Sequence, residues 1–576
     1  METRVGLRRM AVVLAVALLA GVGAFAVLQA AEEDGRAPSS SAAANDDSPD
    51  PGSDRFVPKA AYLKDACDLP PEWVRYIWRG WDPSPARDAD LVLVPKARNY
   101  VGSPASTPHS GPYGYLQRVP LVWYGPGLIE SLGPVELDRE VTVADIAPTQ
   151  AELIEFAQWP SRRSGRSLTE LLTDTTKKPQ LLVTISIDGG GWNVLNRWPD
   201  SWPFLKQLMD EGASVTNAVV GSSPSITPAV HTNMSTGEFP RLHGVTSIGV
   251  RQDNGRIVGG FAQSPDTAGD PEQADPTVNL RMTTIGDLWD EAHDQEPVIG
   301  MVSGGNYVTG LVGFGAALKG ADKDIAAMHG TDDDGNHVWA TNPRFYSSPD
   351  YLNTEVESDE SHMLAVDRLD GEVDGEWRGH SFGLDSSPAF APWQERISIE
   401  LLERERFGQD ELTDLFYLHL KSPDAAGHVY NMIAPEQADV LRSVDRAIEG
   451  LVEYLDDHVE RYVLTITADH GQTPTDRGGW AINRAEVYKD VGERFGNVIE
   501  RTSSTSFFMD RDAMKSNGVT AKEVASFLSR YRIRDNIPPG EQPEGVEERL
   551  DERTFRAVFP GSALPDIVSC TGALEN

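Results

Sequence analysis

Three apolar runs of this sequence are each followed by a carboxylate within four residues. The runs and their acidic residues are Leu181–Ile187 with Asp188, Leu415–Leu420 with Asp424, and Tyr462–Ala468 with Asp469. Near-continuous apolar runs of this length are typical of buried strands in a parallel sheet. Ligand sites form at the carboxyl ends of such strands, so we expect the three carboxylates to meet. A single Asp-Gly pair could be only a turn, but three clustered carboxylates without a cation would repel one another.

Two histidines stand at spacings that suit metal binding. His428 follows Asp424 by four residues, which places both on one face of a helical turn, where they could hold one cation. The simpler alternative is an ordinary turn followed by a helix start. His470 directly follows Asp469, and Gly471 permits the bend that would turn both side chains to the same ion.

Thr227 is the candidate nucleophile. It precedes Pro228, at what the sequence predicts to be a helix start. A hydroxyl at a helix N-terminus faces amide donors that suit a phosphate, and coordination to a metal would activate it. The alternative is that Thr227 only caps the helix, as Ser225 could also do.

The elements between these residues favour an α/β fold. Residues 438–455 place apolar side chains on one helical face, and such helical patterns alternate with the strands. Strand–helix alternation predicts a sandwich with a mostly parallel central sheet. Residues from about 253 to 382 include core segments such as Pro297–Ser303 and also Gly- and Asp-rich loops, which we expect to form a lid or insertion.

Composition restricts the partners. The chain has 576 residues and a formal net charge of −37, so it would repel a nucleic acid polymer. A small phosphoester remains an acceptable substrate if bound divalent metals overcome the acidic field. The oligomeric state does not follow from the sequence.

The N-terminus predicts a location outside the cytoplasm. Residues 10–31 are apolar apart from Gln29 and follow Arg4, Arg8 and Arg9, which is typical of a signal peptide or of a single membrane anchor. Both alternatives stay open, so the protein is expected to be secreted or anchored to the outer face of the membrane. Residues 32–58 have the composition of a disordered linker.

The two cysteines, Cys67 and Cys570, lie at opposite ends of the expected folded part. An even count in an exported protein favours a disulfide between them. Two unpaired buried thiols are the alternative.

Four segments together resemble one known family. ISIDGG, SPSITPAVHTNMSTGEFPRLHGV, SPDAAGH and TADHG, spread over residues 181–473, are similar in kind and order to motifs of the alkaline phosphatase superfamily, in its type I phosphodiesterase and nucleotide pyrophosphatase branch. The resemblance implies a three-layer α/β sandwich that hydrolyses phosphoric esters with two divalent metal ions, expected to be zinc. It assigns one metal to Asp188, Thr227, Asp469 and His470, and the other to Asp424 and His428.

The second metal then lacks a histidine, because none occurs after His470. The segment from Thr107 to Gly127 resembles the family's closing segment, which supplies that histidine. We therefore expect a circular permutation with His109 as the missing ligand. Residues 59–160 would be the permuted C-terminal part of the core, 161–480 the main catalytic core and 481–576 the remaining strands and surface elements. The alternatives are that this segment belongs to a degenerate second domain or that His109 is a plain loop histidine.

Substrate preference is less well indicated. Related diesterases often carry an asparagine shortly after the His-Gly motif, and the segment after His243-Gly244 has none. Arg251 is the candidate substrate-binding residue in its place, with a plain surface charge as the alternative. Monoester and diester preference both stay open. A catalytically silent, surface-anchored binding module with the same fold is the alternative function.

Overall fold

The computed structural model describes residues 61–87, 89–102, 108–475, 479–503, 505–541 and 545–574. The expected signal or anchor segment and the linker at 32–58 lie outside these residues. Within the described part of the chain, no helix is both long enough and apolar enough to cross a bilayer.

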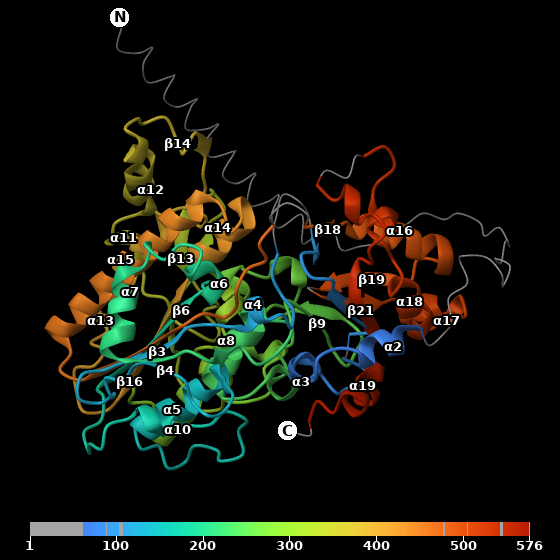
Figure 1. Cartoon of the computed structure of the whole chain (residues 1–576). Coiled ribbons are helices and arrows are strands. Elements are labelled where there is room, and N and C mark those ends of the chain that lie inside the picture. Colours follow the sequence, from blue (N-terminus) through green and yellow to red (C-terminus); the bar gives the residue numbers. More distant parts are fainter. Residues whose placement is uncertain are drawn as a thin grey trace, which may run out of the picture.

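A nine-stranded sheet forms the centre of the larger lobe (Figure 1). The three predicted strands are confirmed as β6 (Leu181–Ile187), β16 (Asp414–Leu420) and β17 (Tyr462–Thr467), and both neighbours pair with β6 in parallel. From one edge, the sheet begins with β13 (His337–Ala340), β12 (Ile325–Thr331) and β11 (Ile299–Ser303). The strands β16, β6 and β17 follow in that order. The sheet ends with β3 (Leu121–Tyr124), β7 (Ala213–Val215) and β4 (Gly133–Val135).

Helices cover both faces of this sheet, because the strand side chains are apolar on both. Along β6, Leu181, Val183 and Ile185 pack into one apolar cluster, whereas Leu182 packs into the other. The first cluster includes residues of α7 (Pro203–Glu211), α13 (Phe390–Arg404) and α15 (Pro435–His458), and the second includes residues of α5 (Ile146–Leu153), α8 (Thr227–Thr236) and α10 (Ile285–Ala292). The predicted three-layer sandwich is therefore confirmed.

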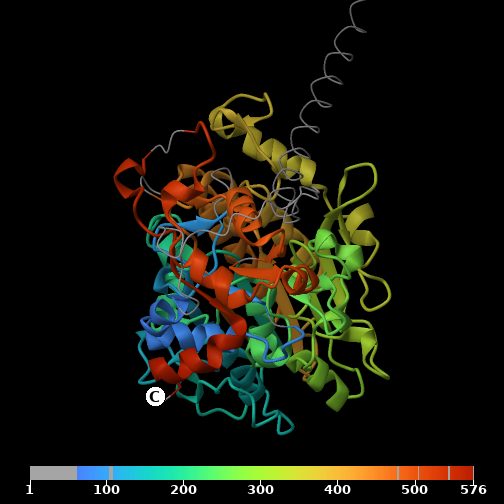
Figure 2. The same cartoon turned by 90° about the vertical axis from the view of Figure 1, so that its right-hand side faces the viewer.

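A smaller lobe is assembled from both ends of the described chain (Figure 2). Its antiparallel sheet joins β1 (Leu91–Pro95) to three late strands, β19 (Ile499–Ser503), β20 (Ser506–Met509) and β21 (Phe555–Pro560). The helices α2 (Ala61–Cys67) and α19 (Leu564–Thr571) pack in the same lobe, and a disulfide joins Cys67 to Cys570 with their Cα atoms 5.7 Å apart. The predicted pairing of the two cysteines is confirmed.

Two segments differ in role from their neighbours in sequence. The early strand β3 inserts between β17 and β7 of the main sheet, antiparallel to both, although β1 just before it belongs to the smaller lobe. Residues from about 253 to 382 supply β11, which agrees with the expected core segment Pro297–Ser303, and they also supply β12 and β13, so more of this segment is core than we expected. Its later part, with α12 (Asp359–Asp367) and β14 (Glu376–Trp377), projects at the top of Figure 1.

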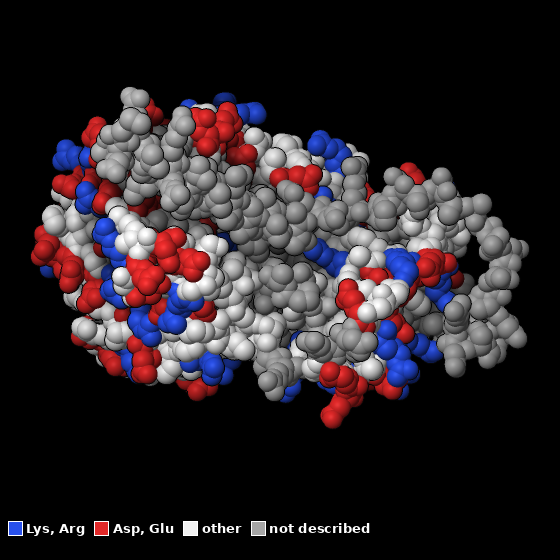
Figure 3. All heavy atoms as spheres, turned by 90° about the horizontal axis from the view of Figure 1, so that it is seen from above, with Lys and Arg blue, Asp and Glu red and all other residues white. Residues whose placement is uncertain are grey.

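Acidic and basic side chains are mixed over both lobes on the face seen from above (Figure 3). No broad field of Lys and Arg interrupts that mixture among the described residues on this face. The absence of a nucleic acid partner stays a prediction, based on the net charge of −37.

Candidate metal centre and nucleophile

The three predicted carboxylates meet at the carboxyl edge of the main sheet. Asp188 directly follows β6 and Asp469 follows β17, while Asp424 lies in α14 (Ser422–Tyr430), which begins just after β16. None is more than 2 % exposed. The main chain ties the ends together, since the Asp188 N–H donates to Leu420 O and the Gly189 N–H donates to Asp469 Oδ1, each at 3.0 Å.

Glycines make this close approach feasible. Gly189 has a φ of +67°, and a Cβ there would lie 2.6 Å from Gln472 Nε2 and 3.1 Å from the Cα of Asp424. A Cβ at Gly471 would lie 2.1 Å from the carbonyl oxygen of Tyr115. The Asp-Gly and His-Gly pairs thus allow three chain segments to pack within the space that a side chain would occupy.

His470 lies between two of the carboxylates. Its Nε2 is 3.2 Å from Asp469 Oδ2 and 3.4 Å from Asp188 Oδ1. Burial lowers the pKa of His470, but the adjacent carboxylates outweigh that effect and raise the pKa to about 9. Burial likewise raises the pKa of Asp469, yet His470 and His231 hold it below its usual value. This group therefore favours positive charge at its centre.

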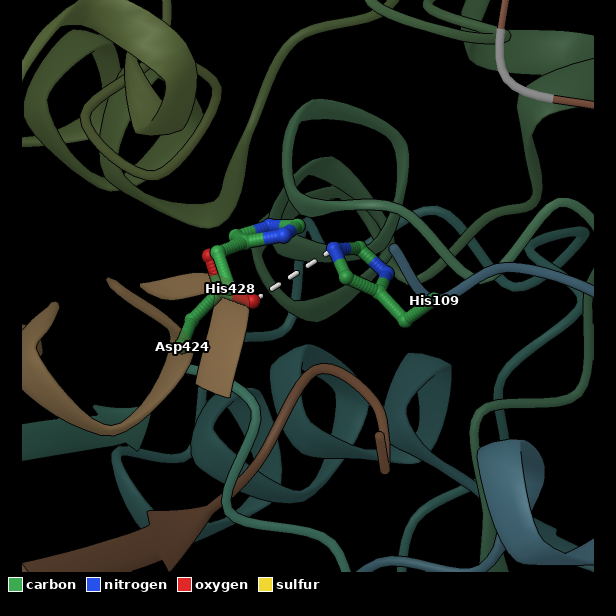
Figure 4. A group of neighbouring side chains, drawn as sticks. All are labelled: His109, Asp424 and His428. Carbon is green, nitrogen blue, oxygen red and sulfur yellow. Dashed lines mark ion pairs between the residues drawn. The ribbon is translucent and has the colours of Figure 1, made fainter. Parts of the chain in front are cut away.

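A second group forms around Asp424 (Figure 4). On α14, His428 Nε2 is 3.4 Å from Asp424 Oδ2, which confirms the expected helical i, i+4 placement. His109 Nε2 lies 3.5 Å from Asp424 Oδ1. The Nδ1 of His109 is 3.2 Å from Ser225 O. Because a carbonyl oxygen only accepts, Nδ1 carries the proton and Nε2 presents a lone pair towards Asp424.

The position of His109 is set by contacts remote in sequence. Its ring stacks on that of His470 with centroids 3.4 Å apart. Nearby, the Gly471 N–H donates to Leu116 O, and Gln117 Nε2 donates to Ser222 O at 2.9 Å. Burial, followed by the charge of His470, places the pKa of His109 well below its usual value. A neutral imidazole is the form that binds a metal.

A helix starts here, as predicted, but Thr227 is itself the first residue of α8, after Ile226 at the N-cap, and is 5 % exposed. Pro228 occupies the first turn, where its missing N–H has no cost. One turn later, His231 Nδ1 donates to Thr227 O at 2.8 Å and lies 3.7 Å from Asp469 Oδ2. The first turn of α8 is therefore adjacent to the carboxylate cluster.

Two further residues of the cluster were not predicted from the sequence. His419 Nε2 donates to Asp188 Oδ2 at 2.8 Å, and its Nδ1 accepts from the Gly304 N–H. Lys421 Nζ donates to Asp188 Oδ2 at 3.0 Å and also to Asp424 Oδ2. Burial lowers the pKa of Lys421, but these carboxylates more than compensate and hold it well above its usual value. The sequence could have indicated both residues by their position, because His419 lies within a fully buried strand and Lys421 directly follows it, and polar groups at such positions need a partner.

Arg251 is not brought to this cluster. It ends β9 (Gly249–Arg251) and is 2 % exposed, with ion pairs to Asp90 and to Glu500 and a hydrogen bond to Met509 O. These partners belong to the smaller lobe or its edge, so the guanidinium ties the two lobes together. Its proposed contact with substrate gains no support and stays a prediction.

The remaining polar atoms fit bound cations. Asp188 Oδ1, Asp424 Oδ1, Asp469 Oδ2 and His470 Nε2 are buried without a hydrogen-bond partner among the described residues. Ligand atoms lie within 4.8 Å of one another in two overlapping groups, His109–Asp424–His428 and Asp188–Asp424–His470. Asp424 thus belongs to both groups, although we expected it at only one metal. Mixed oxygen and imidazole donors around two neighbouring positions suit a pair of divalent metals.

The chain is similar to several known proteins. The family model described as type I phosphodiesterase / nucleotide pyrophosphatase matches residues 182–567. Alkaline phosphatase PafA of Elizabethkingia meningoseptica is 20 % identical over 424 residues, which cover 62 % of this chain and 73 % of PafA. Human ectonucleotide pyrophosphatase/phosphodiesterase family member 7 is 38 % identical over 73 residues, covering 12 % and 16 % of the two chains. The crystal structure of PafA superposes with a TM-score of 0.47 at 16 % identity, over 67 % of this chain and 85 % of PafA.

Proposed function

The chain belongs to the type I phosphodiesterase / nucleotide pyrophosphatase family of the alkaline phosphatase superfamily, and we propose that it is an exported phosphoric ester hydrolase with a threonine nucleophile and two zinc ions. The observation that carries the proposal is the convergence of His109, Asp188, Asp424, His428, Asp469 and His470 from distant parts of the chain. Buried polar atoms without hydrogen bonds are rare in folded proteins, and several of them point at one another here.

The metal-holding roles follow the family resemblance, and the group of His109, Asp424 and His428 agrees with it. His109, Asp424 and His428 would hold one ion, and Asp188, Asp469 and His470, with the Thr227 oxygen, would hold the other. The N and O donors support zinc as the metal. When bound, the two ions supply Lewis-acid charge that favours ionised Thr227 and stabilises the phosphoryl oxygens.

Thr227 would attack the phosphorus atom of the ester. A bond forms between its side-chain oxygen and phosphorus, the bond from phosphorus to the leaving oxygen breaks, and the hydroxyl proton is lost to solvent. Water then attacks the phosphothreonine, which releases phosphate or a phosphomonoester and restores the hydroxyl. The amides at the start of α8 would stabilise the transferred group, because the first helical N–H groups have no partner within a helix.

The segment that carries His109 supports a circular permutation. The family match begins at residue 182, yet His109 and β3 lie before it and reach the site and the main sheet. We propose that this early segment takes the place of the family's closing segment. The disulfide between Cys67 and Cys570 agrees with export, since disulfides persist in oxidising compartments.

A panel of substrates tests the function. The purified protein would be assayed with an aryl phosphate monoester, an aryl phosphate diester and nucleotides, before and after treatment with a chelator. Hydrolysis of at least one class that is lost with chelator and restored by zinc supports the proposal. A metal-free protein with no hydrolysis of any class would favour the silent binding module, and equal turnover with and without metal would contradict the two-zinc proposal.

A further inference from the structure

A second group of carboxylates lies at the opposite end of the same parallel strands. Asp290 belongs to α10, and Asp322 and Asp324 lie in the loop that leads into β12. Since β12, β11 and β16 run in parallel, Asp324 marks the edge where these strands begin, whereas the catalytic carboxylates follow strand ends. In Figure 1, α10 lies at the bottom of the larger lobe and α14 at its top.

The three side chains converge. One carboxylate oxygen from each lies within 4.8 Å of the others. Asp290 is 5 % and Asp324 is 8 % exposed, while Asp322 opens to solvent. Asp290 Oδ1 is buried and has no hydrogen-bond partner among the described residues. A buried carboxylate that has an unpartnered oxygen and lies beside two other carboxylates lacks the donor or cation that such a group requires.

The neighbouring Asp287 provides an internal comparison. One turn earlier on α10, its carboxylate accepts from the Thr284 N–H at 2.7 Å and from the Phe314 N–H at 2.8 Å. Asp290 has no equivalent donor. The adjacent Lys323 does not compensate, because its Nζ donates to Pro343 O. Within the described ranges, no ion pair with Lys, Arg or His involves Asp290, Asp322 or Asp324.

We propose that Asp290, Asp322 and Asp324 bind a calcium ion that is separate from the catalytic metals. The donors are all carboxylate oxygens, which suit a hard cation such as Ca²⁺ better than zinc. Calcium takes six to eight oxygen ligands, so water on the open side at Asp322 completes the shell. The ion joins α10 to the loop before β12 and thereby stabilises this edge of the larger lobe. The proposal does not depend on the catalytic reaction.

Electrostatics agrees with a missing cation. Burial, followed by the charges of Asp322 and Asp287, raises the pKa of Asp290 to about 7. Burial, followed by the charges of Asp287, Asp290 and Asp322, raises the pKa of Asp324 well above its usual value. Ionising these carboxylates together is therefore unfavourable in the absence of a positive charge.

Calcium titration of the metal-loaded enzyme tests this site. In calcium-free buffer, added Ca²⁺ should raise the Tm of the full protein by about 2–5 °C. Asp290→Asn and the exposed Asp322→Asn should each raise the calcium concentration needed for half of this Tm shift at least tenfold. Asp333→Asn, an exposed control in the β12–β13 turn, and Asp424→Asn at the catalytic cluster should both keep it.

The outcomes separate this site from the catalytic one. Without calcium, Asp290→Asn should be at least as stable as the parent protein, because the substitution removes a buried repulsive charge. If the Asp290 carboxylate had only a structural role, its replacement would instead lower the stability of the protein. No calcium-dependent shift in the parent would overturn the proposal. So would an equal shift in Asp290→Asn and Asp322→Asn, or the loss of the shift in Asp424→Asn, which would assign calcium binding to the catalytic cluster.

Discussion

The two lobes use their sheets in different ways. The larger lobe has parallel strands whose carboxyl ends carry Asp188, Asp424 and Asp469, whereas the smaller lobe has an antiparallel sheet and contributes none of the seven candidate ligands. Parallel strands end at the same edge and so gather the residues that follow them. Antiparallel neighbours end at opposite edges, and the smaller lobe instead joins the two chain ends through its disulfide. Six of the seven candidate ligands thus come from the larger lobe, whereas the disulfide that links the two ends of the described chain lies in the smaller lobe.

The largest effect should come from the nucleophile in the larger lobe. Thr227→Ala should lower kcat/KM about 10⁴-fold, since the covalent route is lost while binding and charge stabilisation remain. Metal content and Tm should stay near those of the parent. Kinetic assays with an aryl phosphate, together with metal analysis, measure both. Thr277→Ala, at an exposed threonine in the turn Pro276–Val278, is the control. Turnover within tenfold of the parent would exclude Thr227 as nucleophile.

His109 tests the segment that connects the lobes. His109→Ala should lower kcat/KM by about 10²–10³-fold and reduce bound zinc from about two ions per chain towards one, because one metal loses an imidazole ligand. His293→Ala, a histidine that caps α10 at the opposite end of the parallel strands, should change neither quantity. Unchanged zinc content in His109→Ala would assign this histidine a packing role and would remove the support for permutation.

Lys421 gives a smaller and less obvious effect. Its ammonium contacts two carboxylates that we assign to the metals. Lys421→Met should therefore tighten zinc binding by about tenfold, since one competing positive charge is removed, and should lower the Tm of the metal-free protein because two buried carboxylates lose their cation. Zinc titrations and thermal denaturation measure these effects, with Lys177→Met as an exposed control. Weaker zinc binding would show that Lys421 instead holds the carboxylates in place.

The smaller lobe should respond in stability and hardly at all in activity. The double replacement Cys67→Ser and Cys570→Ser removes the cross-link between the chain ends and should lower the free energy of unfolding by about 2–4 kcal/mol, as measured by urea denaturation. The kcat/KM at a permissive temperature should stay within about twofold. A loss of activity comparable to that of His109→Ala would show that the smaller lobe also positions the catalytic residues.

The sequence by itself determined the local parts of this protein. Apolar runs of six or seven residues, each followed by Asp within four residues, predicted β6, β16 and β17 and the meeting of their carboxylates, because strand length and burial are local properties of the chain. The spacing of Asp424 and His428 predicted their shared helical face for the same reason. The family resemblance, rather than any periodicity, singled out His109.

Only the tertiary structure decided how distant segments meet. It placed Asp424 in both ligand groups and Lys421 between two carboxylates, and it committed Arg251 to partners in the smaller lobe. It also added β12 and β13 to the main sheet beside β11 and brought Asp290 to Asp322 and Asp324. These outcomes depend on which surfaces pack together across long sequence separations. The residue types and spacings within one short segment do not show which distant segment will pack against it.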